Sequence, residues 1–453
     1  MKAGLDDSGE FASRIAGSVA DALASSAPAA AADLVRDLKA PDLAEVIEQL
    51  APDDRLALIQ ALGTSFDYEV LSELDETVRD QLSEALPNEL LARAVTELDT
   101  EDAAYVIESL EESDKQEILA QIPSGDREAL ERALEYPEDS AGRLMQADFV
   151  AVAPYWTVGN VIDHMRESDD LPDEFNEIFV VDPTFRVLGS VELSRLLRTQ
   201  RDITVSTIMN TDRHMVLATE DQEALARQFQ RYDLMSAPVV DANNRLVGVV
   251  TVDDVVEVIQ NEAEEDMKAL AGVGDESLAD SVLETVRSRV PWLIVNLGTA
   301  ILASFVIKAF DATIEQMVAL AVLMPIVASM GGNAGTQTMT VTVRALATNK
   351  LSRVNARRVV TREAFVGVAN GIILSSIIAA VVFFWFGSGK LGGVIGAAMI
   401  VNAIAAALAG ILIPLAMDSL DLDPAPASGV FVTTVTDVVG FFAFLGLASI
   451  WLV

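Results

Sequence analysis

The sequence predicts a multi-domain membrane protein: a helical solenoid, a tandem pair of α/β domains and a long connecting helix, followed by an all-α bundle of five transmembrane helices. Three observations support this prediction. Acidic residues concentrate before about residue 280, whereas long uncharged apolar runs follow it. An apolar pattern recurs every twelve residues in the first part, and a β-hairpin pattern recurs after 59 residues in the second. With 453 residues, the chain is too long for one hydrophobic core.

The charge balance narrows the function. The chain is 51% hydrophobic but carries 69 acidic and 31 basic residues, a net charge of −38. This excludes nucleic acid as a partner, because phosphate binding needs Lys and Arg. It suits cations, although an acidic surface also serves solubility. The absence of cysteine excludes disulfides and thiolate metal sites. The acidic N-terminus shows no signal-peptide pattern.

The N-terminal half begins with an Ala/Ser-rich stretch, residues 1–32, which is predicted to be a mobile tail with some helical character. A short apolar pattern then recurs through residues 33–137. Each copy has apolar residues at positions i, i+1 and i+4, which is the spacing of a helix with one buried stripe. The copies begin at Leu34, Val46, Leu58, Val70, Leu82 (degenerate), Ala94, Val106 and Ile118. Short helices at a fixed period are typical of an α-solenoid. A protein-binding scaffold and an acidic regulatory lobe both fit this pattern.

Residues 138–200 and 201–262 form the tandem pair. Phe179–Val191 and Pro238–Val250 each contain an apolar strand, a polar turn and a second strand opened by an apolar residue and Gly. The pair resembles cystathionine-β-synthase (CBS) domains, a regulatory module that binds adenine nucleotides or senses ions. In nucleotide-binding CBS domains, the turn after the second hairpin strand ends in an Asp that holds the ribose. The second copy keeps this acid in Thr251–Asp254, but Glu192–Arg195 of the first copy lacks it, so ATP binding is left open. His164 and His214 are interpreted as ordinary polar residues.

The connecting segment, residues 253–281, is predicted to be an acidic helix. Helical spacing brings its acids close to one another, and like charges at this spacing repel. These acids are Asp254, Glu257, Glu262, Glu265 and Asp266. A bound Mg²⁺ or Ca²⁺ would relieve the repulsion through oxygen ligands. A solvated acidic face is the alternative interpretation.

The membrane part, residues 288–453, contains five runs long enough to cross a bilayer. They are Val290–Ile307, Gln316–Val343, Ala364–Phe386, Leu391–Met417 and the run that holds Asp437. Lys and Arg cluster between Arg344 and Arg362, so this loop is predicted to be cytoplasmic. The soluble domains then lie inside the cell and the C-terminus outside, in a multi-pass protein of the inner or plasma membrane. The second run is unusual, because it contains Pro325 and the polar, Gly-rich stretch Gly331–Thr338.

Asp437 is the candidate functional residue of this part. It is the only ionisable side chain from Pro424 to Val453. A carboxylate inside a bilayer costs several kcal/mol unless it faces water, a partner or an ion. It therefore indicates an ion path, with a packing aspartate satisfied by the hydroxyls of nearby threonines as the alternative. Those threonines are Thr433, Thr434 and Thr436.

The order of these parts resembles the MgtE family of magnesium channels. The motifs that carry the resemblance are Gly331–Gln337, Arg344–Thr348 and Thr436–Gly440. The resemblance implies a homodimer in membrane lipid, with a pore lined by the second and fifth spans, including Asn333 and Gln337. Two copies of Asp437 would hold a hydrated Mg²⁺ with help from the Thr433 carbonyl. It also implies that Mg²⁺ is a regulatory ligand, which closes the pore by binding acids of the solenoid, CBS pair and connecting ("plug") helix. These acids are Glu69, Asp221, Glu223, Asp233, Asp254, Glu257, Glu262, Glu265, Asp266 and Asp423.

Three positions depart from the family pattern. Tyr105 occupies a solenoid position that is acidic in the family, although Glu101 keeps an acid nearby. Ser428–Val430 starts the fifth span where some relatives have Asn and Pro, and Ser194–Arg195 replaces an Arg-Asp pair. The first departure concerns the contact between the solenoid and the plug helix, the second the cytoplasmic mouth of the pore, and the third nucleotide binding.

Alternative functions remain from other classes. A broader Mg²⁺/Co²⁺ transporter and a non-transporting membrane sensor or scaffold both fit the domain order. An intramembrane protease needs a His-Glu-x-x-His motif or a second membrane aspartate, and neither occurs, so no enzymatic activity is expected. A chloride channel with CBS domains lacks a matching anion-site motif here and does not fit an acidic pore residue.

Overall fold

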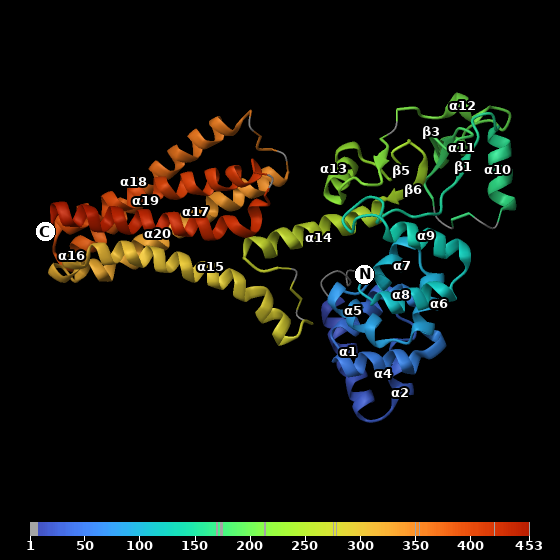
Figure 1. The fold of residues 1–453 in the computed structure, drawn as a ribbon, viewed down its shortest axis with the longest axis horizontal. Coiled ribbons are helices and arrows are strands. Elements are labelled where there is room, and N and C mark those ends of the chain that lie inside the picture. The colour runs from blue at the N-terminus through green and yellow to red at the C-terminus, as the bar shows by residue number, and fades with distance from the viewer. Residues whose placement is uncertain are drawn as a thin grey trace, which may run out of the picture. The chain divides into compact units, whose positions relative to one another are not determined.

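The computed structural model describes residues 8–168, 171–172, 175–212, 214–274, 276–277, 279–348, 350–352, 354–420 and 422–452. Predictions that concern residues 1–7, Asp421 and Val453 lie outside these ranges. The chain divides into two compact units, Met1–Glu262 and Ala263–Val453 (Figure 1). The predicted multi-domain membrane architecture is confirmed.

The first unit starts with short helices joined by tight turns. They are α1 (Ser8–Ala24), α2 (Pro28–Val35), α3 (Ala40–Glu48), α4 (Pro52–Leu62), α5 (Glu76–Ala85), α6 (Asn88–Glu97), α7 (Thr100–Glu108), α8 (Glu112–Gln121) and α9 (Ser124–Leu134), with the 3₁₀ turns η1 (Gly63–Ser65) and η2 (Tyr68–Leu71). The repeat positions are buried as their spacing predicts: Val46 and Ile47 are fully buried, and so are Val106 and Ile107. The copy at Val70 also points inward, but it forms η2 rather than an α-helix.

The N-terminal stretch is more regular than expected. Residues 8–24, expected to belong to a mobile tail with some helical character, form the continuous helix α1. Ala12, Ala16 and Val19 are buried, so one stripe of α1 packs into the solenoid. Because the stripe consists mostly of small alanine side chains, it stands out little from the surrounding sequence. Alanine is nevertheless the best helix former and allows close packing.

The tandem pair consists of two similar three-stranded sheets. The first contains β1 (Ala151–Val152), β2 (Glu177–Val181) and β3 (Val187–Glu192), with helices α10 (Val158–Glu167) and α11 (Leu193–Leu197). The second contains β4 (Val216–Leu217), β5 (Ser236–Val240) and β6 (Leu246–Thr251), with α12 (Val205–Ile208), α13 (Gln222–Tyr232) and α14 (Val252–Leu270). In each sheet the first pair of strands is parallel and the second antiparallel. The two sheets meet where the Ser236 hydroxyl donates to Glu177 Oε1 at 2.7 Å, across the predicted 59-residue repeat.

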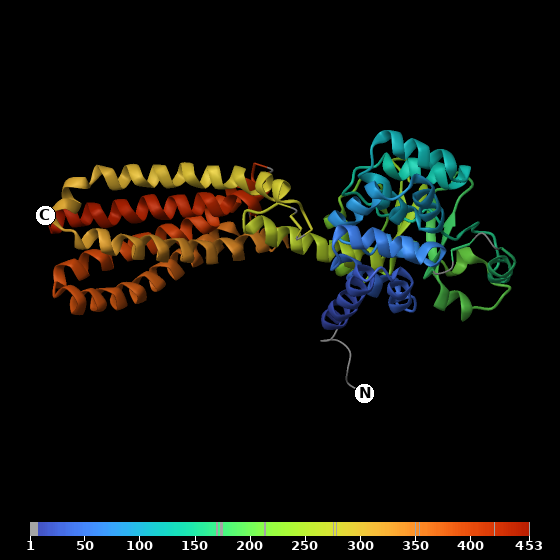
Figure 2. The ribbon, with the colours of Figure 1, turned by 90° about the horizontal axis from the view of Figure 1, so that it is seen from below.

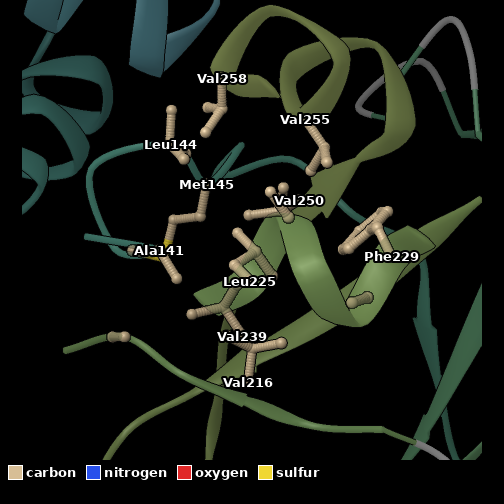
Figure 3. Close-up of a cluster of buried hydrophobic side chains, with 13 residues drawn as sticks. Ala141, Leu144, Met145, Val216, Leu225, Phe229, Val239, Val250, Val255 and Val258 are labelled. Carbon is tan, nitrogen blue, oxygen red and sulfur yellow. The ribbon is translucent and has the colours of Figure 1, made fainter. Parts of the chain in front are cut away.

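The second copy has a continuous apolar core. Strand residues Val216, Val239 and Val250 pack against Leu225 of α13 and Val255 of α14 (Figure 3). The turn that precedes β1 contributes buried Leu144 and Met145 to the same cluster, and Tyr105 of the solenoid packs against it. The start of the connecting helix is therefore part of the CBS core.

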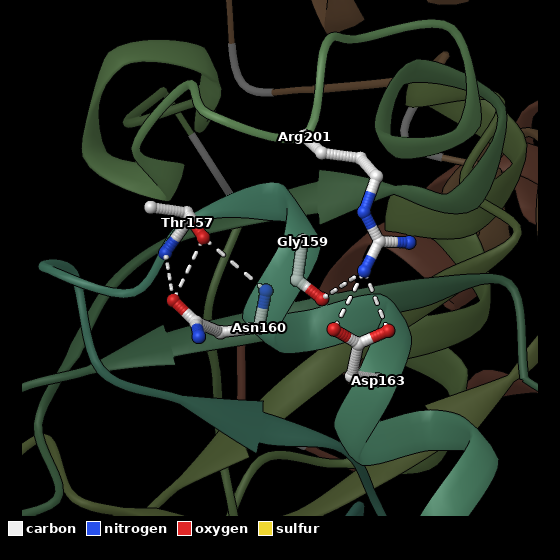
Figure 4. Close-up of polar contacts among 5 residues, drawn as sticks. All are labelled: Thr157, Gly159, Asn160, Asp163 and Arg201. Atoms are coloured by element: carbon white, nitrogen blue, oxygen red, sulfur yellow. Dashed lines mark hydrogen bonds and ion pairs between the residues drawn. The ribbon is translucent and has the colours of Figure 1, made fainter.

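In the first copy, a capping box and an ion pair stabilise helix α10. Thr157 and Asn160 satisfy each other's backbone N–H groups at the start of α10, and Asp163 accepts from the Arg201 guanidinium at 2.6 Å (Figure 4). The same guanidinium reaches the Gly159 carbonyl at 3.3 Å. These contacts fix the linker between the two copies onto the first helix of the pair.

The second unit is a helical bundle. Its helices are α15 (Val282–Ala309), α16 (Asp311–Gln316), α17 (Ala319–Ala347), α18 (Ala356–Phe386), α19 (Gly389–Asp418) and α20 (Pro424–Trp451). Among the described residues, five of them (all but α16) are long and apolar enough to cross a membrane. The axes of these helices are roughly aligned (Figure 2). Helix α19 is the most buried by the rest of the bundle and α15 the least.

The connecting helix is shorter than predicted. Helix α14 ends at Leu270 instead of continuing to residue 281. Gly272 follows with φ of 73°, a left-handed conformation that glycine adopts readily and that commonly ends helices. Ser281 and Glu284 then form a capping box that starts α15.

Candidate functional site

Asp437 lies half-buried on α20, and the neighbouring hydroxyls do not satisfy it. Thr433 Oγ1 donates to the Gly429 carbonyl at 2.9 Å, Thr434 Oγ1 to the Val430 carbonyl at 2.7 Å, and Thr436 Oγ1 to the Thr433 carbonyl at 2.9 Å. An ionised carboxylate only accepts hydrogen bonds, and each hydroxyl has one proton to donate. The alternative of a packing aspartate held by these threonines is therefore not supported by the geometry.

Helix α17 buries Gly331 and Gly335 and exposes Asn333 and Gln337. A side chain at Gly335 would meet Val432 and Thr436 of α20. Asn333 and Gln337 each follow a buried glycine of α17 by two residues and are exposed. Helical geometry places them on the opposite face from the packing glycines. The predicted pore-lining side chains are thus free of the bundle's own packing.

Sequence reasoning missed Asn402 of α19, which is 1% exposed. Its Nδ2 donates to the Val327 carbonyl of α17 at 2.9 Å. The signal was present in the sequence, since Asn402 is the only residue with a polar side chain between Leu391 and Met417. Polar side chains inside membrane helices commonly bond across helices.

A first acidic cluster forms where α7 meets the start of α14. Burial, followed by neighbouring carboxylates including Asp254, raises the pKa of Asp102 to about 7. Burial and the adjacent carboxylates likewise raise the pKa of Asp254 to about 6, and that of Glu101 well above its usual range. Glu101 is 4% exposed, and its Oε2 has no hydrogen-bond partner among the described residues. Charging all of these groups together is therefore costly.

Basic and aromatic groups border this cluster. The Arg79 guanidinium lies 5.3 Å from the centre of the Tyr105 ring. Burial raises the pKa of Glu257, and the charge of Arg79 opposes that rise. Glu73, whose pKa is raised by burial and by Glu257, extends the cluster toward exposed Glu69. Asp102 and Glu73 are further members that sequence reasoning did not identify.

A second acidic cluster forms where the start of α13 meets Glu262 of α14. Gln222 Nε2 donates to Glu262 Oε1 at 2.9 Å and to Asp139 Oδ1 at 3.4 Å. Burial raises the pKa of Glu262, and the charges of Glu223, Asp221 and Asp139 raise it further. Asp221 also caps α13 by accepting from the Ala224 N–H at 3.0 Å. The structure therefore brings together three of the predicted acids and adds Asp139.

The remaining predicted acids lie elsewhere. Asp233 ends α13 in a left-handed conformation with φ of 52°. Glu265 and Asp266 are exposed on the second half of α14. Asp423 caps α20 by accepting from the Ala425 N–H at 2.9 Å. Within the described ranges, no group of three or more His, Asp or Glu side chains is arranged to hold a metal ion in this conformation.

The two CBS copies differ in the turn that bears on nucleotide binding. In the second copy, Asp254 Oδ2 accepts from the Thr251 hydroxyl at 2.7 Å, and the same carboxylate belongs to the first acidic cluster. In the first copy, the Ser194 hydroxyl donates to Glu192 at 3.3 Å. His164 lies edge-on to Trp156, and His214 stacks on Tyr232 at 3.7 Å.

The end of α14 contacts the bundle. Ala269 and Leu270 pack against Met339 and Val343 of α17 and Val432 of α20. The same two helices carry Asn333, Gln337 and Asp437. Asp254, Glu257 and Glu262 of α14 thus take part in the acidic clusters, and Ala269 and Leu270 of α14 pack in the bundle.

These features define an integral membrane protein with a helical domain and a CBS pair before its spanning helices. Family models match in the same order: the MgtE intracellular N domain at residues 38–139, the CBS domain at 141–202 and 205–261, and the MgtE divalent cation transporter at 324–447. The chain is 32% identical to the "Magnesium transporter MgtE" of Thermus thermophilus over 90% of this chain and 95% of that protein. It is 29% identical to the Bacillus subtilis protein of the same name over 92% and 95%.

The chain therefore belongs to the MgtE family of divalent cation transporters. A solved structure of "the cytosolic domain of the Mg2+ channel MgtE in complex with ATP" is 31% identical, covering 54% of this chain and 99% of that chain with a TM-score of 0.49.

Proposed function

We propose that this protein is a Mg²⁺-selective channel that admits magnesium across the inner or plasma membrane and is gated by intracellular Mg²⁺. Its curated relatives are named magnesium transporters. The proposed channel is a homodimer whose pore lies on the two-fold axis. The positive loop between Arg344 and Arg362 supports cytoplasmic soluble domains and an external C-terminus.

The observation that carries the proposal is the Asp437 carboxylate. It is the only ionisable side chain from Pro424 to Val453, and the adjacent threonine hydroxyls donate to the backbone instead. Mg²⁺ gives up its water reluctantly and is held by one or two carboxylates plus waters. Two copies of Asp437 facing each other would suit such an ion, with the Thr433 carbonyl accepting from its water. Asn333 and Gln337 would line the same path.

The proposed gate uses the acidic clusters as the sensor. Without a cation, Asp102, Asp254 and Glu257 repel one another, which favours separation of α14 from the solenoid. Bound Mg²⁺ would cancel this repulsion and hold α14 in place. The packing of Leu270 against α17 and α20 supports a mechanical connection from the sensor to the pore. Glu69, Glu262, Asp221, Glu223, Asp233, Glu265, Asp266 and Asp423 are proposed as further sensor acids.

Growth of a bacterium that lacks its own Mg²⁺ uptake systems tests the transport function. Expression of this protein is expected to restore growth in medium low in Mg²⁺, whereas the Asp437→Ala variant is not. A broader divalent transporter would in addition sensitise the cells to Co²⁺. If membrane-localised protein gives no rescue, the non-transporting sensor or scaffold is the correct function and the channel proposal is wrong.

A further inference from the structure

The amide of Asn402 fills a notch between two other helices of the bundle. A Cβ added at Gly331 of α17 would overlap with Asn402 Nδ2, and one at Gly440 of α20 would lie 2.7 Å from the same atom. At both glycines the three nearest atoms all belong to Asn402. A single polar side chain of α19 thus sets how closely α17 and α20 approach it.

The notch lies beside the proposed ion path. Gly440 follows Asp437 by three residues, which is less than one helical turn, and Gly331 precedes Asn333 by two. The hydrogen bond from Asn402 also falls close to the proline of α17. Pro325 has no N–H, so the Ala321 carbonyl loses its partner in the helix, and the Val327 carbonyl, two residues after Pro325, accepts from Asn402.

Packing alone does not explain an asparagine here. Asn402 Oδ1 is buried and has no hydrogen-bond partner within the described residues. Burying an unsatisfied polar atom is costly, and a leucine of similar shape would avoid that cost. The feature that asparagine supplies and leucine lacks is the donor to the Val327 carbonyl.

We propose that Asn402 is a positioning residue of the ion path: it fixes α17 against α20 beside Asp437 and thereby sets how Asn333 and Asp437 meet the ion. This inference rests on the proposed channel function. Asn402 itself touches no ion in this account. Its effect is on the affinity of the path for Mg²⁺.

Two variants separate positioning from space filling. Asn402→Leu keeps a side chain branched at Cγ and removes the donor. The triple variant Asn402→Ala, Gly331→Ala, Gly440→Ala refills the notch from the other two helices, because both added methyl groups then point into the space that the amide leaves. Each is purified in detergent, checked for its oligomeric state and thermal midpoint, and reconstituted in vesicles for Mg²⁺ flux.

Both variants are expected to fold, and the Mg²⁺ concentration for half-maximal flux is expected to rise about three- to twentyfold, the range that interhelical hydrogen bonds in membranes support. Wild-type affinity in either folded variant would contradict the proposal, because it would show that Asn402 only fills space. Failure of both variants to fold would also contradict it, since the role would then be structural. Wild-type and Asp437→Ala vesicles are measured in parallel, so that absent wild-type flux identifies failure of the channel function itself.

Discussion

Replacing Asp437 with Asn is expected to reduce Mg²⁺ flux through the reconstituted protein at least about 100-fold, since two lost carboxylates each remove several kcal/mol of attraction for a divalent ion. Two unit charges 4 Å apart attract by about 4 kcal/mol at an effective dielectric constant of about 20. Asn has the same shape as Asp, so the loss reports charge rather than packing. Flux is measured with a Mg²⁺-sensitive dye inside vesicles.

The matched control for this prediction is Asp437→Glu, which keeps the charge and moves it outward by one methylene. It is expected to retain measurable flux with altered preference among Mg²⁺, Ca²⁺ and Co²⁺. Wild-type flux in Asp437→Asn would remove Asp437 from the ion path.

The second large effect is expected at the first acidic cluster. In the wild-type protein, Mg²⁺ in the millimolar range is expected to lengthen the lifetime of α14 under protease by at least about fivefold, the lower end of typical coupling between sites. In the double variant Asp102→Asn, Asp254→Asn this ratio is expected to fall to near one. Removing the acids abolishes both the repulsion that favours opening and the Mg²⁺ binding that favours closure. The protease lifetime of α14 then no longer depends on Mg²⁺.

The matched control is Asp53→Asn, an exposed acid on α4 that takes no part in either cluster. Like Asp102→Asn, it removes one negative charge from the solenoid, and it is expected to leave the protection ratio unchanged. An undiminished ratio in the double variant would show that Mg²⁺ acts elsewhere. Equal losses in both variants would point to the net charge of the domain instead of the cluster.

The solenoid and the CBS pair are well predicted, because periodic apolar residues determine which face of a helix or strand is buried. Ile47 and Ile107 occupy equivalent repeat positions and are both fully buried. The copy at Val70 keeps its burial but forms a 3₁₀ turn, since a periodicity specifies the buried side more strongly than the type of helix. The packing of helix α1 was not predicted, because its buried stripe is mostly alanine.

The candidate sites were predicted less completely, because they depend on which elements meet. Asp254 and Glu257 are conspicuous on one acidic helix, but Asp102 and Glu73 join them only through the folding of the solenoid. Asn402 has no acidic neighbour in the sequence, and its role depends on glycines 71 and 38 residues away that only the bundle brings to it.

In the proposed channel, one ion both passes Asp437 and closes the path from the cytosolic side. Mg²⁺ current in inside-out membrane patches is the decisive measurement, because the bath then reaches the proposed cytosolic domains. We expect a Mg²⁺ current when this bath is free of Mg²⁺, a fall in current as bath Mg²⁺ rises through the millimolar range, and no current in Asp437→Asn. If the wild-type current is absent in all baths, or does not change with bath Mg²⁺ beyond the change in driving force, the proposed Mg²⁺-gated channel is wrong.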